Sequence, residues 1–298
     1  MMTKRERIME WFLYKDRHRS HNLITLITKH GSLKLSNGYE LKVNKKNYSD
    51  IIKLYYFTMR YGVELREESG YWKYRDGIIV TPDGIKFTLR GFNPTIFFET
   101  FVNDYHFVSF DLEQKYVINA GGFVGDTALY FAYKGAFVYS FEPDPNSYGI
   151  AVKNVELNPD LKGKITMRNW AVGRGDGSIN FPVNENDSGS SSVFSPIGYK
   201  KVEVRSVSIS TILKVFDIKE PFLLDLDVKG MEYEVINDFS ISKFNIVRIE
   251  FSTQIKGKTI GTRKIIEEKL KKYGFTYFRI YSLGGMDLNL GGVIEARK

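Results

Sequence analysis

From Lys115 to the end of the chain, short apolar runs alternate with amphipathic segments. Apolar runs predict strands at residues 116–120, 137–141, 164–171, 222–227 and 245–251, and helical spacing predicts helices at 126–133, 145–157, 231–238 and 262–273. Two last strands, at 275–281 and 293–296, are joined by a glycine-rich loop without a helix, which indicates an antiparallel pair. This alternation predicts an α/β fold with a mostly parallel sheet and helices on both faces.

Residues 172–208 interrupt the alternation. They contain the polar run Asn184–Ser192 and a predicted strand at Lys201–Val207. We interpret the segment as either a lid over a ligand site or a hairpin insertion, and the polar run fits a disordered surface loop equally well.

The first 110 residues follow a different pattern and predict a small α+β appendage. Helical spacing favours helices at Lys4–Tyr14 and at residues 49–61. The dipeptides Asn37-Gly38, Asp76-Gly77 and Asp83-Gly84 favour tight hairpin turns because they tolerate positive φ angles. We therefore expect two domains, at residues 1–110 and 111–298.

The composition excludes several kinds of chemistry. The 298 residues include no cysteine, which rules out disulfides, thiolate nucleophiles and cysteine-bound metals. All four histidines precede residue 107, so the larger domain works without imidazole. The net charge of +8 allows attraction to nucleic acid, phosphorylated ligands or acidic membrane surfaces. No apolar stretch approaches the roughly 20 residues that span a bilayer, and we expect a cytoplasmic protein without a transmembrane segment.

A glycine-rich turn follows the first predicted strand of the larger domain. Glycines there let the backbone approach a nucleotide-like ligand, and the helix that follows presents unpaired N–H groups. A tight turn without a ligand is the alternative. The candidate ligand-binding residues are Asn119, Gly121, Gly122, Phe123, Gly125 and Asp126.

Glu142 ends the second predicted strand, 21 positions after Gly121. That spacing is close to the roughly 20-residue interval at which an acidic side chain binds both hydroxyls of a ribose. Capping of the helix that begins near Pro145 is the alternative role. A ribose fits either NAD or S-adenosylmethionine, but the G-x-G-x-x-G spacing for a pyrophosphate is absent, and the closing antiparallel pair is foreign to the usual dinucleotide fold. S-adenosylmethionine is therefore the better fit, and a dehydrogenase is the weaker alternative.

Over residues 115–255 the chain resembles the FkbM family of methyltransferases. Five family patterns occur in order. The first two are D-x-G-A-x-x-G-D at residues 119–126 and F-E-P at residues 141–143, the latter followed by Asn154 and Asn158. The other three are A-x-G-x-x-x-G at Ala171, Gly173 and Gly177, G-S-S-S at residues 189–192, and K-x-D-x-E-G-x-E at residues 225–232, which precedes Ile249-Glu250. The resemblance implies a class I, Rossmann-like methyltransferase with a seven-stranded sheet, S-adenosylmethionine as methyl donor and an oxygen acceptor on a natural product or glycan. Donor contacts then extend to Pro143, Trp170 and Ala171; Phe123 and Trp170 either flank the sulfonium or pack in the core.

Three positions depart from the family pattern. Asn119 replaces an aspartate and lacks the charge that would complement the donor's ammonium or sulfonium. Asp225 and Lys229 stand where the family has lysine and glutamate, which reverses the charges but leaves a Lys–Asp pair open. Asp227 and Glu232 match the pattern.

Methyl transfer to a hydroxyl needs in-line alignment and a proton acceptor. The candidate catalytic residues are Asp227, Glu232, Glu250 and, if burial lowers its pKa, Lys229. We favour Asp227 because the carboxyl end of a parallel strand faces the ligand crevice; capping of the helix after Gly230 is its alternative role. A divalent cation held by Asp227 with Asp225 or Glu250 is not favoured, since no dense ligand cluster is present.

We therefore expect an S-adenosylmethionine-dependent O-methyltransferase that acts on a hydroxyl of a small-molecule or glycan-like acceptor. An RNA or other nucleic-acid methyltransferase is one alternative, motivated by the basic charge and by Lys4, Arg5 and Arg7. A non-catalytic nucleoside-binding or partner-binding module is another, motivated by Asn119 and the reversed charges. Against the nucleic-acid reading, the sequence lacks an N-P-P-Y-like motif.

Overall fold

The computed structural model describes residues 18–106, 109–183, 200–255, 257–282 and 287–298. The chain forms two compact units, Met1–His106 and Phe107–Lys298, and each is described by itself. The predicted helix at Lys4–Tyr14 and the polar run Asn184–Ser192 lie outside the described residues. Within the described ranges, none of the helices has the length and apolar character needed to cross a membrane.

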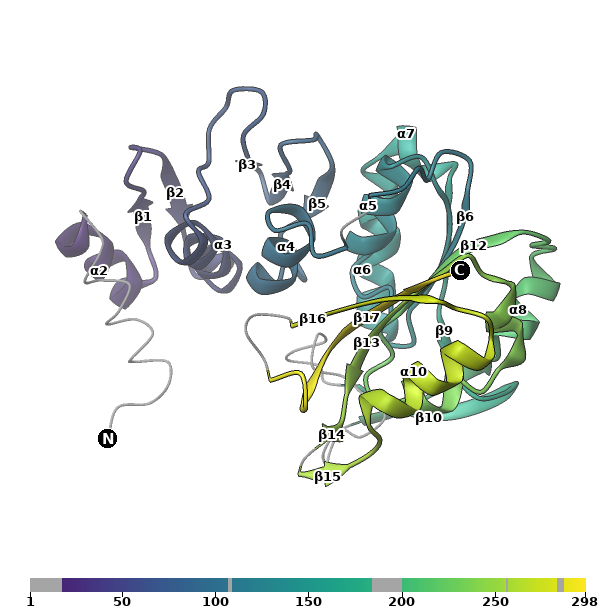
Figure 1. Ribbon diagram of the computed structural model, residues 1–298. Helices are drawn as coiled ribbons and strands as arrows, with labels where there is room; N and C mark the ends of the chain where they lie inside the picture. Colours follow the sequence, from purple (N-terminus) through teal and green to yellow (C-terminus); the bar gives the residue numbers. More distant parts are fainter. Residues whose placement is uncertain (1–17, 107–108, 184–199, 256, 283–286) are drawn as a thin grey trace. The chain divides into compact units, whose positions relative to one another are not determined.

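The N-terminal unit contains three helices and two small antiparallel sheets among its described residues (Figure 1). In chain order these are α2 Arg19–Thr28, β1 Gly31–Lys34, β2 Glu40–Val43, α3 Tyr48–Tyr61, β3 Lys73–Arg75, β4 Ile78–Val80, β5 Lys86–Thr88 and α4 Pro94–Phe101. The three predicted turn dipeptides join the paired strands, and Asp76 and Gly77 both have positive φ. Its core includes the fully buried Phe57, Phe87, Phe92 and Phe97. Helices α2 and α4 were not predicted.

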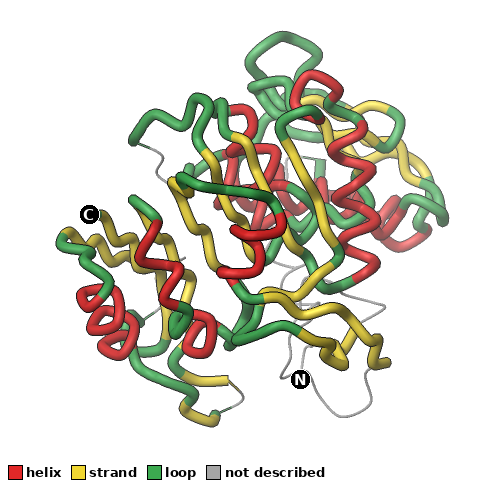
Figure 2. Tube along the Cα trace, turned by 90° about the vertical axis from the view of Figure 1, so that its right-hand side faces the viewer, coloured by secondary structure: helices red, strands yellow, loops and turns green. Residues whose placement is uncertain are grey.

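The larger unit is built on a seven-stranded sheet of order β16-β17-β13-β12-β6-β7-β8, whose strands Figure 2 shows side by side. Its strands are β6 Tyr116–Ala120, β7 Phe137–Phe141, β8 Ile165–Arg168, β12 Pro221–Leu226, β13 Ile246–Ser252, β16 Tyr277–Tyr281 and β17 Gly291–Arg297. All neighbours are parallel except β17, which runs antiparallel to β13 and β16. This is the predicted class I methyltransferase sheet with its antiparallel C-terminal pair.

Helices cover the sheet and bury its apolar side chains (Figure 1). They are α5 Asp126–Tyr133, α6 Pro145–Glu156, α7 Pro159–Lys162, α8 Ile209–Val215, α9 Glu232–Val235, the 3₁₀ helix η2 Phe239–Lys243 and α10 Arg263–Lys272. Side chains of α8, α9, η2 and α10 form one core with residues of β6, β7, β12 and β13. Helices α5 and α6 contact β6, β7 and β8.

Two predicted elements differ from the structure. The strand predicted at 164–171 divides at Asn169 into β8 and β9 Trp170–Val172, which belong to different sheets. The helix predicted at 231–238 is the single turn α9, followed by η2. The segment 172–208 contains β10 Gly177–Val183, which was not predicted as a strand, and it forms an antiparallel hairpin with β11 Lys200–Val207, so the interpretation as a hairpin insertion is confirmed. A short hairpin of β14 Gln254–Ile255 and β15 Lys258–Thr259 follows β13.

Candidate functional site

The glycine turn, residues Gly121–Gly125, follows β6 and is held by backbone hydrogen bonds to the neighbouring strands. The N–H groups of Gly121 and Gly122 both donate to the carbonyl oxygen of Phe141, at 2.9 Å each. Gly121 has φ +98°, and a Cβ on it would overlap the carbonyl oxygen of Asp227 at the end of β12. The turn therefore sits between the carboxyl ends of β7 and β12, where ligands of open α/β sheets bind.

Helix α6 supports the same turn from the side. Asn154 donates from Nδ2 to the carbonyl oxygen of Val124 at 2.8 Å, and Asn158 donates to the carbonyl oxygen of Asn154 at 2.7 Å. Both asparagines are buried. A Cβ on Gly125 would lie 3.3 Å from that of Ala151. The two asparagines of the sequence pattern therefore fix the turn and its supporting helix.

Glu142 points at the glycine turn. Its two carboxylate oxygens accept hydrogen bonds from the backbone N–H groups of Phe123 and Asp144, at 2.8 Å each. The side chain is 8% exposed, and this burial raises the pKa of Glu142 to about 8, although those N–H groups and the charge of Lys229 act in the opposite direction. Glu142 does not cap α6, as its alternative role required; Asp144 is the N-cap and accepts from the N–H groups of Asn146 and Ser147.

Asn169 is a site residue that the sequence did not single out. It lies between β8 and β9 and donates from Nδ2 to the carbonyl oxygens of Glu142, at 2.8 Å, and Pro143, at 3.0 Å. It thus fixes the backbone on which Glu142 stands, and it explains why the predicted third strand divides at this position. Its sequence context gave no signal, because Lys164, Thr166 and Arg168 are also polar residues of the same predicted strand.

The chain that leaves β12 brings Asp227 to the glycine turn, and Lys229 and Glu232 follow within five residues. The N–H of Asp227 donates to the carbonyl oxygen of Ala120 at 2.9 Å. Burial, the largest effect, raises the pKa of Asp227, and the negative charge of Asp225 acts in the same direction. The positive charges of Lys229 and Arg248 act in the opposite direction. Both carboxylate oxygens of Glu232 accept from the N–H of Gly230, at 2.9 and 2.8 Å, and burial raises the pKa of Glu232 to about 7.

Asp227 does not cap the following helix, because the N-cap position of α9 is Met231 and has no side-chain hydrogen bond. Lys229 is exposed and adopts φ +44°. Its charge acts on both Glu142 and Asp227, so the ends of β7 and β12 form one electrostatic cluster.

Four further predicted residues lie outside the hydrogen bonds described above. The Trp170 ring stacks on Phe141 with centroids 5.9 Å apart, and the Arg205 guanidinium lies 4.3 Å from its centre. Ala171 packs in a small apolar cluster of the β9–β11–β10 sheet. Asp126 is buried in the first turn of α5, and Glu250 is half-buried on β13. Trp170 and Ala171 therefore have packing roles in the structure.

Asn119 and Asp225 are buried neighbours on β6 and β12. Asn119 donates from Nδ2 to Asp225 Oδ2 at 3.0 Å, and Asp225 Oδ1 pairs with Arg248 Nη1 at 2.5 Å. The cation that pairs with Asp225 is therefore Arg248 on β13. Among the residues that the structure describes, no three histidine, aspartate or glutamate side chains gather in a way that would hold a metal ion.

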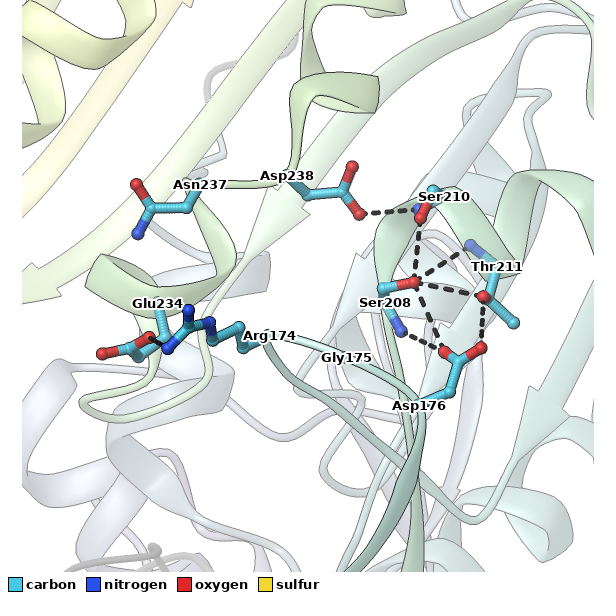
Figure 3. Close-up of a pocket in the computed structure, with 9 residues that line it drawn as sticks. All are labelled: Arg174, Gly175, Asp176, Ser208, Ser210, Thr211, Glu234, Asn237 and Asp238. Carbon is cyan, nitrogen blue, oxygen red and sulfur yellow. Dashed lines mark hydrogen bonds and ion pairs between the residues drawn. The ribbon is translucent and has the colours of Figure 1, made fainter.

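A polar hollow of about 500 Å³ lies on the larger unit (Figure 3). It is lined by Arg174, Gly175, Asp176, Ser208, Ser210, Thr211, Glu234, Asn237 and Asp238. Asp176 accepts from Thr211 Oγ1 at 2.6 Å and from the N–H of Ser208 at 3.0 Å, and these bonds lower the pKa of Asp176. The lining of this polar hollow includes none of the predicted donor-binding or catalytic residues.

The family model for the methyltransferase FkbM domain matches residues 119–277. A search of curated proteins finds no match to this chain. Among solved structures, the chain is similar to the N-terminal domain of human METTL16 in complex with SAH, at 12% identity and TM-score 0.41, covering 95% of this chain and 97% of that one.

Two further structures are similar over a smaller share of this chain. Magnesium protoporphyrin IX methyltransferase from Synechocystis PCC 6803 with bound SAM has 15% identity and TM-score 0.37, covering 66% of this chain and 74% of that one. Precorrin-6y C5,15-methyltransferase from Geobacter metallireducens GS-15 has 12% identity and TM-score 0.34, covering 62% and 82%. With the family model spanning more than half of its length, the chain belongs to the FkbM family and is an S-adenosylmethionine-dependent methyltransferase.

Proposed function

We propose that this methyltransferase acts on a hydroxyl group of a small-molecule or glycan-like acceptor, with Asp227 as the proton acceptor. The observation that carries the proposal is the position of Asp227, at the exit of β12 and in backbone contact with the glycine turn. A carboxylate whose pKa is raised by burial is suited to take a hydroxyl proton. The exit of β12 reads Asp225-Leu226-Asp227-Val228, without the N-P-P-Y-like motif for base amino groups.

The residues at the glycine turn fit the methyl donor. An ionised carboxylate offers about four acceptor positions. The N–H groups of Phe123 and Asp144 each use one oxygen of Glu142. The remaining positions suit the two hydroxyls of a ribose. We therefore propose Gly121, Gly122, Phe123 and Glu142 as donor-binding residues, with Asn169 and Asn154 supporting them.

The proposed reaction needs alignment and one proton transfer. S-adenosylmethionine, when bound, supplies an electrophilic methyl group on a sulfonium. Asp227 accepts the proton of the acceptor hydroxyl as its oxygen forms the bond to the methyl carbon and the carbon–sulfur bond breaks. Lys229 stabilises the ionised form of Asp227, which keeps this carboxylate ready to accept the proton.

Donor binding is expected to strengthen as the pH rises from 6 to 8.5. Glu142 has a pKa of about 8 without ligand, so most of it carries a proton at pH 6 to 7. The ribose hydroxyls donate to the ionised form, so binding releases that proton, and affinity rises up to about tenfold per pH unit below the pKa. Calorimetric titration with adenosylhomocysteine across this range measures the slope.

The matched variant for this titration is Glu142→Gln, which keeps the shape of the side chain but does not titrate. It is expected to bind more weakly, with an affinity that does not follow the pH. A wild-type affinity that stays constant from pH 6 to 8.5 would contradict the role of Glu142.

Asp227→Asn is expected to lower the rate constant kcat for hydroxyl methylation by about 10²- to 10⁴-fold, the usual contribution of a general base. The affinity for adenosylhomocysteine should stay within a few-fold, because the backbone contact of residue 227 with Gly121 remains. Transfer of a labelled methyl group to a panel of sugars and small hydroxylated compounds, with RNA in parallel, provides the measurement.

The exposed Asp217→Asn serves as the control and should leave the rate unchanged. If the labelled methyl group appears on RNA and on none of the hydroxylated compounds, the proposed acceptor class is overturned. An Asp227→Asn variant that keeps the wild-type rate would overturn the proposed base.

A further inference from the structure

A row of buried polar side chains crosses the central strands beneath the glycine turn. Ser140 on β7, Asn119 on β6, Asp225 on β12 and Arg248 on β13 are register partners, each with the next. Ser140 Oγ donates to Asn119 Oδ1 at 2.7 Å, Asn119 Nδ2 donates to Asp225 Oδ2 at 3.0 Å, and Arg248 Nη1 donates to Asp225 Oδ1 at 2.5 Å. The four residues, called the polar row, are all buried.

The polar row contains one negative and one positive charge. An aspartate at position 119, as in the family pattern, would place a second carboxylate against Asp225 in the sheet interior, where like charges repel strongly. Asn119 instead donates an N–H to Asp225, and Arg248 supplies the cation from the next strand. The amide of Asn119 and the cation of Arg248 therefore both compensate the carboxylate at position 225.

The row reaches the glycine turn at its Ser140 end. A Cβ on Gly122 would overlap Ser140 Oγ, so this hydroxyl lies directly against the turn. The hydrogen bond to Asn119 holds the hydroxyl in place. At the other end, Arg248 Nε donates to the hydroxyl of Tyr281 on β16 at 3.2 Å, which fixes the guanidinium. A chain of contacts thus connects Arg248, on the second strand from β6, with the backbone of Gly122.

We propose that Arg248 is a positioning residue for donor binding: through Asp225 and Asn119 it holds Ser140, and with it the glycine turn, in the geometry that binds S-adenosylmethionine. The inference rests on the placement of the donor at the glycine turn in the proposed function. It predicts that an unpaired Asp225 disturbs the turn, because a buried carboxylate without its cation must take up a proton or find new partners.

Calorimetry with adenosylhomocysteine tests the positioning role of Arg248 and needs no methyl acceptor. Arg248→Gln is expected to weaken binding at least tenfold. The double variant Asp225→Asn/Arg248→Gln, in which the row is neutral and its amides can pair, is expected to return to within about threefold of wild type. Ser140→Ala, which removes only the hydroxyl beneath Gly122, is expected to weaken binding three- to tenfold. Combined with Arg248→Gln, it should add little further loss, since both act on the same contact.

The possible results distinguish a failure of the role of Arg248 from a failure of the donor site. Thermal unfolding establishes which variants are folded, and a folded Arg248→Gln that binds like wild type would overturn the role of Arg248. If that variant does not fold, unchanged binding by Ser140→Ala would overturn it instead. A wild-type protein that binds no adenosylhomocysteine would contradict the donor site itself, whereas loss of binding in the variants alone supports the positioning role.

Discussion

Alanine at position 121 is expected to abolish donor binding and to lower the free energy of unfolding by about 3 to 5 kcal/mol, from positive-φ strain and overpacking combined. Gly121 has φ +98°, and an added Cβ would overlap the carbonyl oxygen of Asp227. The backbone of β12 cannot retreat easily, because the N–H of Asp227 is bonded to Ala120. We expect at least a 100-fold loss of affinity for adenosylhomocysteine, measured by calorimetry beside chemical unfolding.

Gly149→Ala is the matched control for this substitution. Gly149 lies within α6 of the same unit, and its Cβ would meet no atom within 4 Å. Alanine in a helix interior is expected to stabilise the protein by about 0.5 to 1 kcal/mol, with donor affinity unchanged. A Gly121→Ala protein that unfolds and binds like Gly149→Ala would show that the turn is looser than its contacts indicate.

The second large effect is expected on stability when Arg248 is replaced by glutamine. Arg248 and Asp225 form a buried pair whose side chains are 7% and 3% exposed. Removal of one partner leaves an uncompensated charge in the sheet, which costs about 3 to 5 kcal/mol. Replacing both charges with amides, in Asp225→Asn/Arg248→Gln, is expected to recover most of this loss. Urea unfolding of the wild type and both variants measures it.

Arg263→Gln provides the comparison with an ordinary surface pair. Arg263 and Glu267 pair at 2.8 Å on α10 in an i,i+4 arrangement, with Arg263 well exposed. Such pairs contribute only about 0.2 to 0.5 kcal/mol. A loss at Arg248 no larger than that at Arg263 would mean that the buried pair contributes nothing of its own.

The sequence predicted the larger unit well because its signals are local. The strands β6, β7 and β12 are mainly apolar runs followed by Gly121, Glu142 and Asp227, and α10 matches its predicted helix within one residue at each end. Helix α4 was missed because its aromatic residues favour strands by propensity. Its start was nevertheless marked, since Asn93 caps the helix and Pro94 occupies its first turn. The aromatic run concealed a readable helix signal.

Long-range contacts account for the rest. The strand at 164–171 reads as one continuous element, and only the bonds from Asn169 to the carbonyl groups after β7 reveal its break. Glu142 was found from its spacing to Gly121, whereas Arg248 shares its strand with Glu250 and its buried partner lies on another strand. A buried arginine predicts a carboxylate neighbour, but strand order is needed to identify Asp225. The domain boundaries and the roles of the site residues stay predictions.

A crystal structure of the protein with adenosylhomocysteine tests the donor site most directly. We predict that both ribose hydroxyls lie within hydrogen-bond distance of the Glu142 carboxylate, with the nucleoside against the backbone of residues 121–123. A nucleoside bound elsewhere, for example in the polar hollow beside Asp176, with Glu142 still bonded only to Phe123 and Asp144, would contradict the assignment.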